Sequence, residues 1–485
     1  MSRRFFNMSS WARSTRPGVL LILVFVLTLP GVTRRIYASD EIQYFSFLRS
    51  LWFDGDVSFD NEYRFFYDSG ITRYDGFRDT FLEARTETGR RLNFGTIGCA
   101  ILWSPFYAIA DLGVMAARAF GSTVPQNGFS PPYIGAVCIG SAVYGLLALL
   151  LSAAAARRVL SLLGHNLSAS WWAAWAVWLG TPLLFYMYVA PPMAHATSAF
   201  AVSAFVLAWL AVRDTWSPRG MILLGALGAL VAMVREQDAF FLLGPALDFA
   251  WSMARVGRRR RLLLSAVAGS VAFVLTFLPQ AAVYLSLNGH LGPSPLVSRK
   301  MTWTAPHLLD VLISTEHGFL WWTPICCLAV LGWILAVTGS TRLPSTPDHR
   351  PATLRLGICL LIMAAFQVYV AGSVESWTVA GAFGQRRFVA MTPLLVIGLA
   401  VLLARTRAGA PRWILALSVV AGIWWNIGLM IQFGAGWMDR QRLDVPRNAY
   451  NTFVIVPRRI PDIAYRYLFE RHSFFQKAPP PGGSR

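Results

Sequence analysis

Long apolar runs, separated by short loops rich in arginine, occupy most of the chain. Many of these runs approach the roughly 20 residues that an α-helix needs to cross a bilayer. The pattern predicts an all-α polytopic membrane protein with about eleven transmembrane helices. The predicted spans lie near residues 17–36, 133–156, 170–190, 194–212, 219–234, 239–254, 262–286, 318–338, 354–371, 388–404 and 413–432.

One apolar stretch, residues 94–120, is not assigned a span. It is interrupted at Ser104-Pro105, and proline removes a hydrogen bond from the backbone ladder of a helix. We therefore expect a broken re-entrant or interfacial element on the outer side of the membrane. An ordinary span here would invert the following spans and place the basic run Arg258–Arg261 outside.

The basic loops set the predicted orientation, because short arginine-rich loops tend to stay in the cytoplasm. Residues 1–16 are then cytoplasmic, 17–432 form the transmembrane domain, and 433–485 form an outer tail with a disordered, proline-rich end. The clusters assigned to the cytoplasmic side are Arg3, Arg4, Arg13 and Arg16; Arg157 and Arg158; Arg213 and Arg219; Arg255 with Arg258–Arg261; Arg342, Arg350 and Arg355; and Arg405, Arg407 and Arg412.

With this orientation, residues 37–132 form an outer cap. Its first part, 37–93, carries 11 of the 24 acidic residues, interleaved with aromatic residues. A disordered tail would lack that apolar content, so we expect a folded, helical cap lying on the bilayer. Asp40 and Glu41 follow directly after the first predicted span. A carboxylate pair at a membrane surface is a candidate for general-base or metal chemistry.

Composition agrees with a membrane protein, since 55% of the residues are hydrophobic and 14% are charged. The formal charge of +19 would suggest nucleic acid in a soluble protein. Here it reflects cytoplasmic loops and anionic lipid, and no nucleic-acid partner is expected. The five cysteines lie in or beside apolar runs, without C-x-x-C spacing, and are interpreted as small core residues. A Walker loop and an H-E-x-x-H motif are absent from the sequence, which argues against nucleotide-driven transport and zinc proteolysis.

Two basic pairs, Arg386-Arg387 and Arg299-Lys300, fall on the predicted outer side, against the positive-inside tendency. Phosphate suits the planar fork of arginine, so both pairs are candidate anion-binding groups. The alternative is that they form structural ion pairs with carboxylates of the cap. Glu236 and Asp238 lie near a predicted membrane boundary and could order a phosphate through a cation, but pairing with Arg235 in a turn is favoured.

Several motifs, in this order along the chain, resemble the C-type integral-membrane glycosyltransferases (GT-C). The resemblance is to the bacterial branch that includes protein O-mannosyltransferases and lipid A aminoarabinose transferases, and it extends from Arg16 to about Gln432. The motifs are Tyr37-Ala-Ser-Asp40-Glu41-Ile-Gln-Tyr44, Leu48-Arg49-Ser50-Leu51, Asp54-Gly55-Asp56, Asn61-Glu62-Tyr63, the stretch from Gly95 to Trp103-Ser-Pro105, Pro192-Met193-Ala194-His195, Glu316-His317-Gly318 and Gly384-Gln385-Arg386-Arg387-Phe388.

The resemblance implies a GT-C-like fold and a polyprenyl-phosphate-linked sugar as donor. It implies that Asp40 is the catalytic base, with Glu41 as its neighbour. An acceptor hydroxyl needs such a carboxylate to take its proton, while the lipid phosphate leaves with negative charge. Arg386 and Arg387 are the first candidates to stabilise that charge, and Arg299 and Lys300 the second.

The chain departs from the family at Ala190-Pro-Pro-Met-Ala-His195, where relatives often carry a second acidic residue. His195 could act instead as a hydrogen-bond partner or proton carrier, although a lone histidine at a helix entrance is more often structural. The missing acid weakens the case for a two-carboxylate metal site, because hard divalent cations need several oxygen ligands. Asp40, Glu41 and Asp56 could still form one, so the cofactor stays open between none and a divalent cation.

The function expected from the sequence is transfer of a sugar from a polyprenyl-phosphate donor to a lipid, glycan or protein acceptor. The reaction would take place on the outer face of the bacterial cytoplasmic membrane. One alternative is a transporter or flippase for lipid-linked glycans, which should carry its charges within the spans. This chain's charges cluster outside the spans, which favours the enzyme. A catalytically silent scaffold with the same fold is the remaining alternative.

Overall fold

The computed structural model describes residues 8–255, 259–338, 350–379, 381–406 and 408–470. Within these ranges the chain is all-α, as predicted, and extended pairing is limited to the isolated bridges Arg85–Arg91 and Met301–Val374. The longer helices are α1 Met8–Thr28, α2 Ser39–Arg49, α3 Asp60–Asp68, α5 Gly98–Ala119, α6 Pro131–Leu162, α7 Ala169–Gly180, α9 Ala194–Val212, α10 Pro218–Val234, α11 Leu243–Arg255, α12 Arg259–Asn288, α16 Ile325–Thr338, α17 Arg350–Gly372, α18 Thr392–Arg405, α19 Ala410–Ala435 and α21 Val456–Phe469.

Short helical segments connect them. These are the α-helices α4 Asp75–Phe77, α8 Leu183–Tyr188, α13 Pro295–Arg299, α14 Leu308–Ile313, α15 Phe319–Trp322 and α20 Val445–Tyr450, the 3-10 helices η1 Leu29–Gly31, η4 Glu236–Leu242 and η5 Arg386–Met391, and the π-helical turns η2 Ser50–Asp54, η3 Arg78–Glu83 and η6 Asn451–Ile455.

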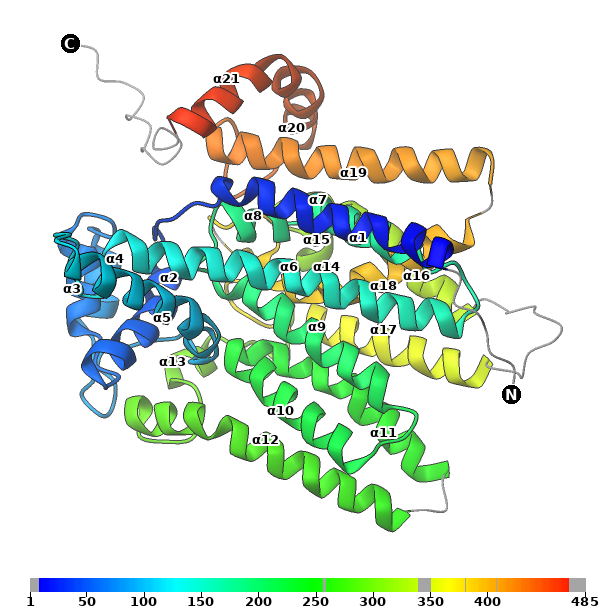
Figure 1. Cartoon of the computed structure of the whole chain (residues 1–485), viewed down its shortest axis with the longest axis horizontal. Helices are drawn as coiled ribbons and strands as arrows, with labels where there is room; N and C mark the ends of the chain where they lie inside the picture. The colour runs from blue at the N-terminus through cyan, green and yellow to red at the C-terminus, as the bar shows by residue number, and fades with distance from the viewer. Residues whose placement is uncertain (1–7, 256–258, 339–349, 380, 407, 471–485) are drawn as a thin grey trace.

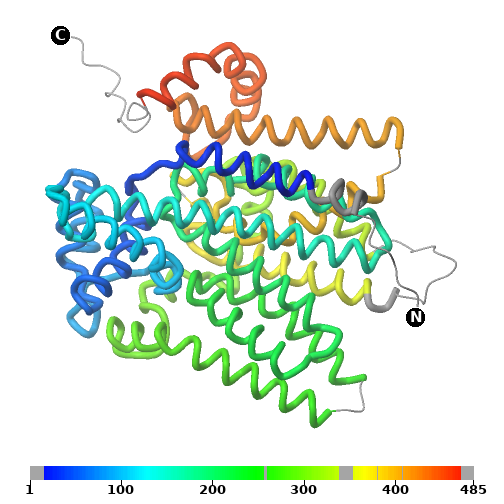
Figure 2. Tube along the Cα trace, viewed as in Figure 1, coloured from blue at the N-terminus to red at the C-terminus, as the bar shows by residue number. Residues whose placement is uncertain are grey.

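The long helices run side by side between two ends of the molecule (Figure 1). One end carries the cap, which follows the dark-blue helix α1 and is drawn in mid-blue to cyan, whereas α1 and α6 themselves run along the bundle (Figure 2). The opposite end carries the described parts of the loops that were predicted to be cytoplasmic, such as the α9–α10 and α18–α19 turns. The basic loops and the acidic cap are thus separated to opposite ends of the bundle.

Seven described helices are long and apolar enough to cross a membrane, which indicates a membrane protein. The predicted count of about eleven is not confirmed, because several predicted spans are shorter or interrupted. Prolines account for two of the interruptions, since their nitrogen has no hydrogen to donate. Pro182 separates α7 from α8 within the predicted span 170–190, and Pro324 separates α15 from α16 within 318–338. The predicted span 239–254 is replaced by η4 and the 13-residue α11.

The prediction that residues 94–120 are broken at Ser104-Pro105 is wrong. The segment forms the continuous 22-residue helix α5, with Pro105 inside it. By length and composition α5 is also one of the seven candidate spans. However, it packs against the first half of α6: Leu102 O accepts from the Tyr144 hydroxyl at 2.7 Å, and the Tyr133 hydroxyl donates to Asp111 at 2.6 Å. Helix α5 therefore lies at the cap end of the bundle (Figure 1).

The first outer loop folds around its aromatic residues. Phe65 stacks on Phe129 with ring centroids 4.1 Å apart, and Phe45 packs edge-on against Phe66 and Tyr107. Each aromatic ring removes a large apolar area from water, so this cluster supplies the cap with a core of its own. The cap is in this way fixed on α5 and the start of α6, and α2 is fixed with it.

The predicted tail from residue 433 is also helical in part. Helix α19 continues to Ala435, and α20, η6 and α21 then pack beside its end, as the orange and red segments of Figure 2 show. The disorder that we predict for the proline-rich end lies outside the described residues, as do the first seven residues of the amino terminus.

A buried ion cluster joins three helices at the end opposite the cap. Asp248 on α11 is fully buried and accepts two hydrogen bonds from Arg213, directly after α9, at 2.8 and 3.2 Å. Arg355 on α17 forms an ion pair with the same carboxylate at 2.6 Å, and the Trp209 indole donates to it at 2.8 Å. Both carboxylate oxygens are therefore occupied by protein groups, as a buried charge requires.

Candidate functional site

Asp40 and Arg386 meet at the cap end, although 346 residues separate them in the sequence. The Arg386 guanidinium donates from Nη1 to Asp40 Oδ2 at 2.7 Å. The Asp40 side chain is 41% exposed, and no second side-chain hydrogen bond to it is found among the described residues. One arginine thus orients the carboxylate, while part of it stays open to an incoming molecule.

The local sequence explains why Asp40 lies at the start of a helix with its carboxylate partly exposed. An extended segment leads from Gly31 to Ala38, and α2 begins at Ser39, so Asp40 lies in the first helical turn. The backbone N–H groups of that turn favour a negative charge. Arg386 opens η5, the 3-10 entry to α18, which packs against α9. The site therefore lies between the start of a cap helix and the start of two bundle helices.

Arg387, the neighbour of Arg386, is buried without an ion pair among the described residues. Only 7% of it is exposed. Its guanidinium donates to Ser376 O at 2.9 Å, to the Ser376 hydroxyl at 3.2 Å and to Trp377 O at 3.4 Å. Carbonyl and hydroxyl dipoles solvate the charge but do not neutralise it. Arg387 therefore adds uncompensated positive charge beside Asp40 and Arg386.

His195, at the start of α9, contacts a third arginine. Its Nδ1 lies 3.1 Å from Nη1 of Arg235, the residue between α10 and η4. A guanidinium only donates, so Nδ1 accepts and the imidazole proton must lie on Nε2. The ring also packs edge-on against Tyr186, 4.4 Å between centroids. This contact holds His195 in one tautomer.

The guanidiniums of Arg235, Arg386 and Arg387 interact electrostatically with one another and with the His195 ring. Tyr44, on α2, lies within the fields of Asp40, Arg235 and Arg386; burial raises the pKa of its hydroxyl, and the two arginines oppose that rise. These residues form a single group, which we call the arginine centre: Asp40, Tyr44, His195, Arg235, Arg386 and Arg387.

The expected pairing of Arg235 with Glu236 and Asp238 is wrong, since neither carboxylate forms an ion pair with it. Asp238 is fully buried and accepts from the Ser198 hydroxyl, while Glu236 accepts from the Tyr284 hydroxyl. The carboxylates of η4 are thus directed to α9 and α12. Arg235 is left to the arginine centre, where Asp40 is the one ion-paired carboxylate among the described residues.

Glu41 has a different position from Asp40. Its Oε2 accepts from the backbone N–H groups of Tyr37 at 2.6 Å and Ala38 at 3.1 Å, and its side chain is buried. This arrangement caps the amino terminus of α2 with a carboxylate from its own first turn. Burial raises the pKa of Glu41 to about 7. Glu41 therefore positions Asp40 by fixing the helix start.

The structure does not bring Asp40, Glu41 and Asp56 together as a metal site. Helix α2 and the turn η2 separate Asp40 from Asp56 by about 20 Å of helical rise. Asp56 Oδ1 instead accepts from the Ser50 hydroxyl at 2.8 Å and the Ser58 N–H at 3.0 Å, which closes a turn of the cap. Within the described ranges no group of three or more histidine, cysteine or acidic side chains has a metal-binding arrangement.

The second basic pair makes no side-chain hydrogen bond or ion pair with the arginine centre among the described residues, although Lys300 O accepts from the N–H of Glu375, the neighbour of Ser376. Arg299 and Lys300 are exposed at the end of α13, and the Lys300 ammonium lies 6.0 Å from the Phe94 ring centre. Neither contacts Asp40 or Arg386 in the described structure. Of the two predicted basic pairs, the structure therefore places only Arg386-Arg387 beside the candidate base.

Sequence reasoning missed Arg235 as a member of this group. The signal was present, because Arg235 follows the predicted span 219–234 at its outer end and so breaks the positive-inside tendency in the same way as Arg386. The acidic residues directly after it concealed this signal. Tyr44 carries no separate signal in the sequence beyond its motif, and its place opposite the arginines depends on how α2 packs.

The arrangement combines a half-exposed carboxylate with surplus positive charge in a sparsely solvated setting. Such a carboxylate can take a proton from a hydroxyl, and such guanidiniums can hold an oxyanion. Comparisons of the chain with protein-family models, with curated proteins and with solved structures give no match. The case for a function therefore depends on the arginine centre and on the sequence motifs around it.

Proposed function

We propose that the protein is a membrane glycosyltransferase that uses a polyprenyl-phosphate-linked sugar and acts on the outer face of the bacterial cytoplasmic membrane. The observation that carries the proposal is the contact of Asp40 with Arg386, beside two further arginines that form no ion pair with any carboxylate in the described part of the chain. The motif resemblance and the membrane-spanning helices support it. The acceptor class stays open between lipid, glycan and protein.

In the proposed reaction Asp40 takes the proton of the acceptor hydroxyl. The acceptor oxygen forms a bond to the anomeric carbon of the sugar, and the bond from that carbon to the phosphate oxygen breaks. The electron pair leaves with the polyprenyl phosphate, and attack from the opposite side inverts the anomeric configuration. The developing charge is stabilised by Arg386 and Arg387, which are fixed before the donor arrives.

The remaining residues have positioning roles in this proposal. Arg235 holds the neutral His195 ring, and the Nε2–H of that ring is then available as a hydrogen-bond donor. Glu41 fixes the start of α2 and with it the position of Asp40. Any divalent cation would have to be held by Asp40 and by oxygens of the polyprenyl-phosphate sugar, because the carboxylates of Glu41 and Asp56 are engaged elsewhere.

The test is Asp40→Asn in purified full-length protein in liposomes that contain a radiolabelled undecaprenyl-phosphate sugar and envelope glycan. Loss of a general base should lower sugar transfer about 10²- to 10⁴-fold. Asp68→Asn, at an exposed position of the cap, is the matched control and should transfer at the wild-type rate. The proposal fails if Asp40→Asn transfers as fast as wild type. Movement of intact lipid-linked glycan across the bilayer, without cleavage of its sugar–phosphate bond, would support the transporter alternative.

A further inference from the structure

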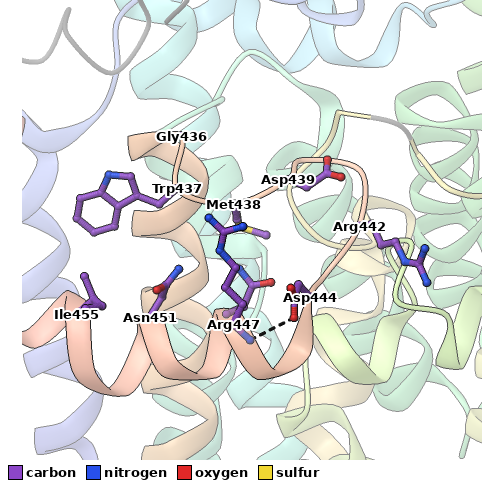
Figure 3. Close-up of a pocket in the computed structure, with 10 residues that line it drawn as sticks. Gly436, Trp437, Met438, Asp439, Arg442, Asp444, Arg447, Asn451 and Ile455 are labelled. Atoms are coloured by element: carbon purple, nitrogen blue, oxygen red, sulfur yellow. Dashed lines mark hydrogen bonds between the residues drawn. The ribbon is translucent and has the colours of Figure 1, made fainter. Parts of the chain in front are cut away.

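A cavity separate from the arginine centre lies in the carboxyl-terminal segment. It measures about 500 Å³, within the range of roughly 300–1,000 Å³ typical of small-molecule sites. Figure 3 shows Trp437 and Asp439 on the loop after α19, facing Arg447 on α20 and Asn451 on η6. No function considered so far has used this cavity.

The Trp437 ring is held at the cavity by the end of α19. Gly436 adopts a left-handed conformation, with φ at 70°, and the Trp437 N–H donates to Gln432 O at 2.9 Å. This pattern ends a helix with a defined direction for the following residue. The ring is half-buried and lines the cavity, and no aromatic ring stacks on it among the described residues.

A buried polar group of the cavity wall also lacks a partner. Asn448 is 2% exposed, and its Nδ2 donates to Gln432 Oε1 at 3.0 Å. The orientation of Gln432 is fixed, because its Nε2 donates to Gly428 O, Asn448 O and the Thr452 hydroxyl. Asn448 Oδ1 is therefore a defined acceptor, and no described residue donates to it. This oxygen has almost no accessible surface, so Asn448 and Gln432 form a rigid hydrogen-bonded wall behind the cavity and do not offer the oxygen itself to a ligand.

The charged residues that line the cavity limit which class of ligand can bind there. Two arginines, Arg442 and Arg447, are matched by two aspartates, Asp439 and Asp444. A phosphate site would show surplus positive charge, as the arginine centre does, whereas this lining is balanced. An aromatic ring in the cavity wall, combined with amide, carboxylate and guanidinium groups, suits a neutral polyhydroxylated molecule. Its C–H face can pack on the indole while its hydroxyls bond to the polar groups.

We propose that this cavity binds a neutral carbohydrate of one or two sugar units. Its role as the acceptor subsite, which would make the acceptor a glycan, rests on the proposed glycosyltransferase function. A physical connection between the two sites exists in the segment before η5. Arg387 holds that segment at Ser376 and Trp377, and Gln441 beside the cavity accepts from the Gly381 N–H at 3.1 Å.

The experiment is calorimetric titration of the full-length protein in nanodiscs with cellobiose, maltose, lactose and N,N′-diacetylchitobiose. At least one of these should bind saturably to wild type. Trp437→Ala should weaken that binding about tenfold, as expected for loss of an aromatic contact. Asn451→Ala, which removes an amide that makes no side-chain hydrogen bond with described residues, should weaken it about threefold. Tyr450→Ala changes an exposed aromatic outside the lining and should have no effect.

Three results would overturn carbohydrate binding. They are no saturable binding of any of the four disaccharides, equal binding by wild type and Trp437→Ala, and displacement of the sugar by inorganic phosphate. Asp40→Asn separates this inference from the proposed function, since it should lower transfer about 10²- to 10⁴-fold and leave sugar binding unchanged. If Asp40→Asn transfers normally and Trp437→Ala still loses binding, the proposed function fails and the carbohydrate site stands.

Discussion

The two arginine clusters at opposite ends of the bundle balance their charge in different ways. At the end away from the cap, Arg213 and Arg355 share the fully buried Asp248, whose oxygens are all engaged. At the cap end, Asp40 is 41% exposed and engages one of three arginines. A closed cluster joins helices, whereas an open cluster with surplus charge can accept an anionic ligand. The same residue types therefore have different predicted roles.

The largest effect is expected from Asp248→Asn. It leaves two buried guanidiniums without a counterion, and breaking a buried ion pair costs about 3–5 kcal/mol. The midpoint of thermal or denaturant unfolding in detergent measures this. Asp214→Asn, at an exposed position two residues before the Trp216 indole, is the control and should lie within about 0.5 kcal/mol of wild type. A loss below about 1 kcal/mol would contradict a structural role for the closed cluster.

Arg386→Ala should mainly affect activity. It removes a charge that orients Asp40 and that, in the proposed reaction, would stabilise the leaving phosphate, so transfer should fall about 100-fold. The unfolding midpoint should change much less than in Asp248→Asn, because the Asp40–Arg386 pair is partly exposed. Arg386→Lys keeps the charge and should retain more activity than Arg386→Ala. Wild-type transfer by Arg386→Ala would show that the open cluster is not the donor site.

Glu41 should make the stability of the cap end depend on pH. Its folded pKa of about 7 lies above the usual value of 4.5, so the folded state binds its proton more tightly. The contribution of Glu41 to the free energy of unfolding is then fully present below pH 4.5 and is lost as pH rises to about 7. Glu41→Gln keeps an oxygen for the Tyr37 and Ala38 N–H groups without this titration. The difference in melting temperature, wild type minus Glu41→Gln, should fall between pH 5 and 7.5, and a constant difference would contradict the assignment.

The smallest effect is expected from the double variant Arg299→Ala/Lys300→Ala. Both side chains are exposed and lie outside the arginine centre, so the rate of transfer should change less than about twofold at physiological salt. Transfer assayed beside Arg386→Ala measures this. A loss as large as that of Arg386→Ala would mean that the phosphate site extends over both basic pairs.

The sequence by itself determined the features that depend on local patterns. Apolar runs predicted an all-α membrane protein, and arginine-rich loops predicted which segments share an end. The placement of Asp40 directly after the first run, and of Arg386 in an outer loop, identified two members of the candidate centre. These inferences succeed because helix formation, bilayer length and charge at helix ends depend mainly on neighbouring residues.

The tertiary structure decided which of these groups meet. The sequence left Arg386 open between phosphate binding and pairing with the cap, and the packing of η5 against α9 brings it to Asp40 at the start of α2. The tertiary structure also brings Arg235 to His195 and not to the adjacent Glu236 and Asp238. Glu41 likewise caps the start of α2, beside Asp40. Such contacts join residues that are distant in sequence, so they depend on helix packing and buried hydrogen bonds that no local pattern records.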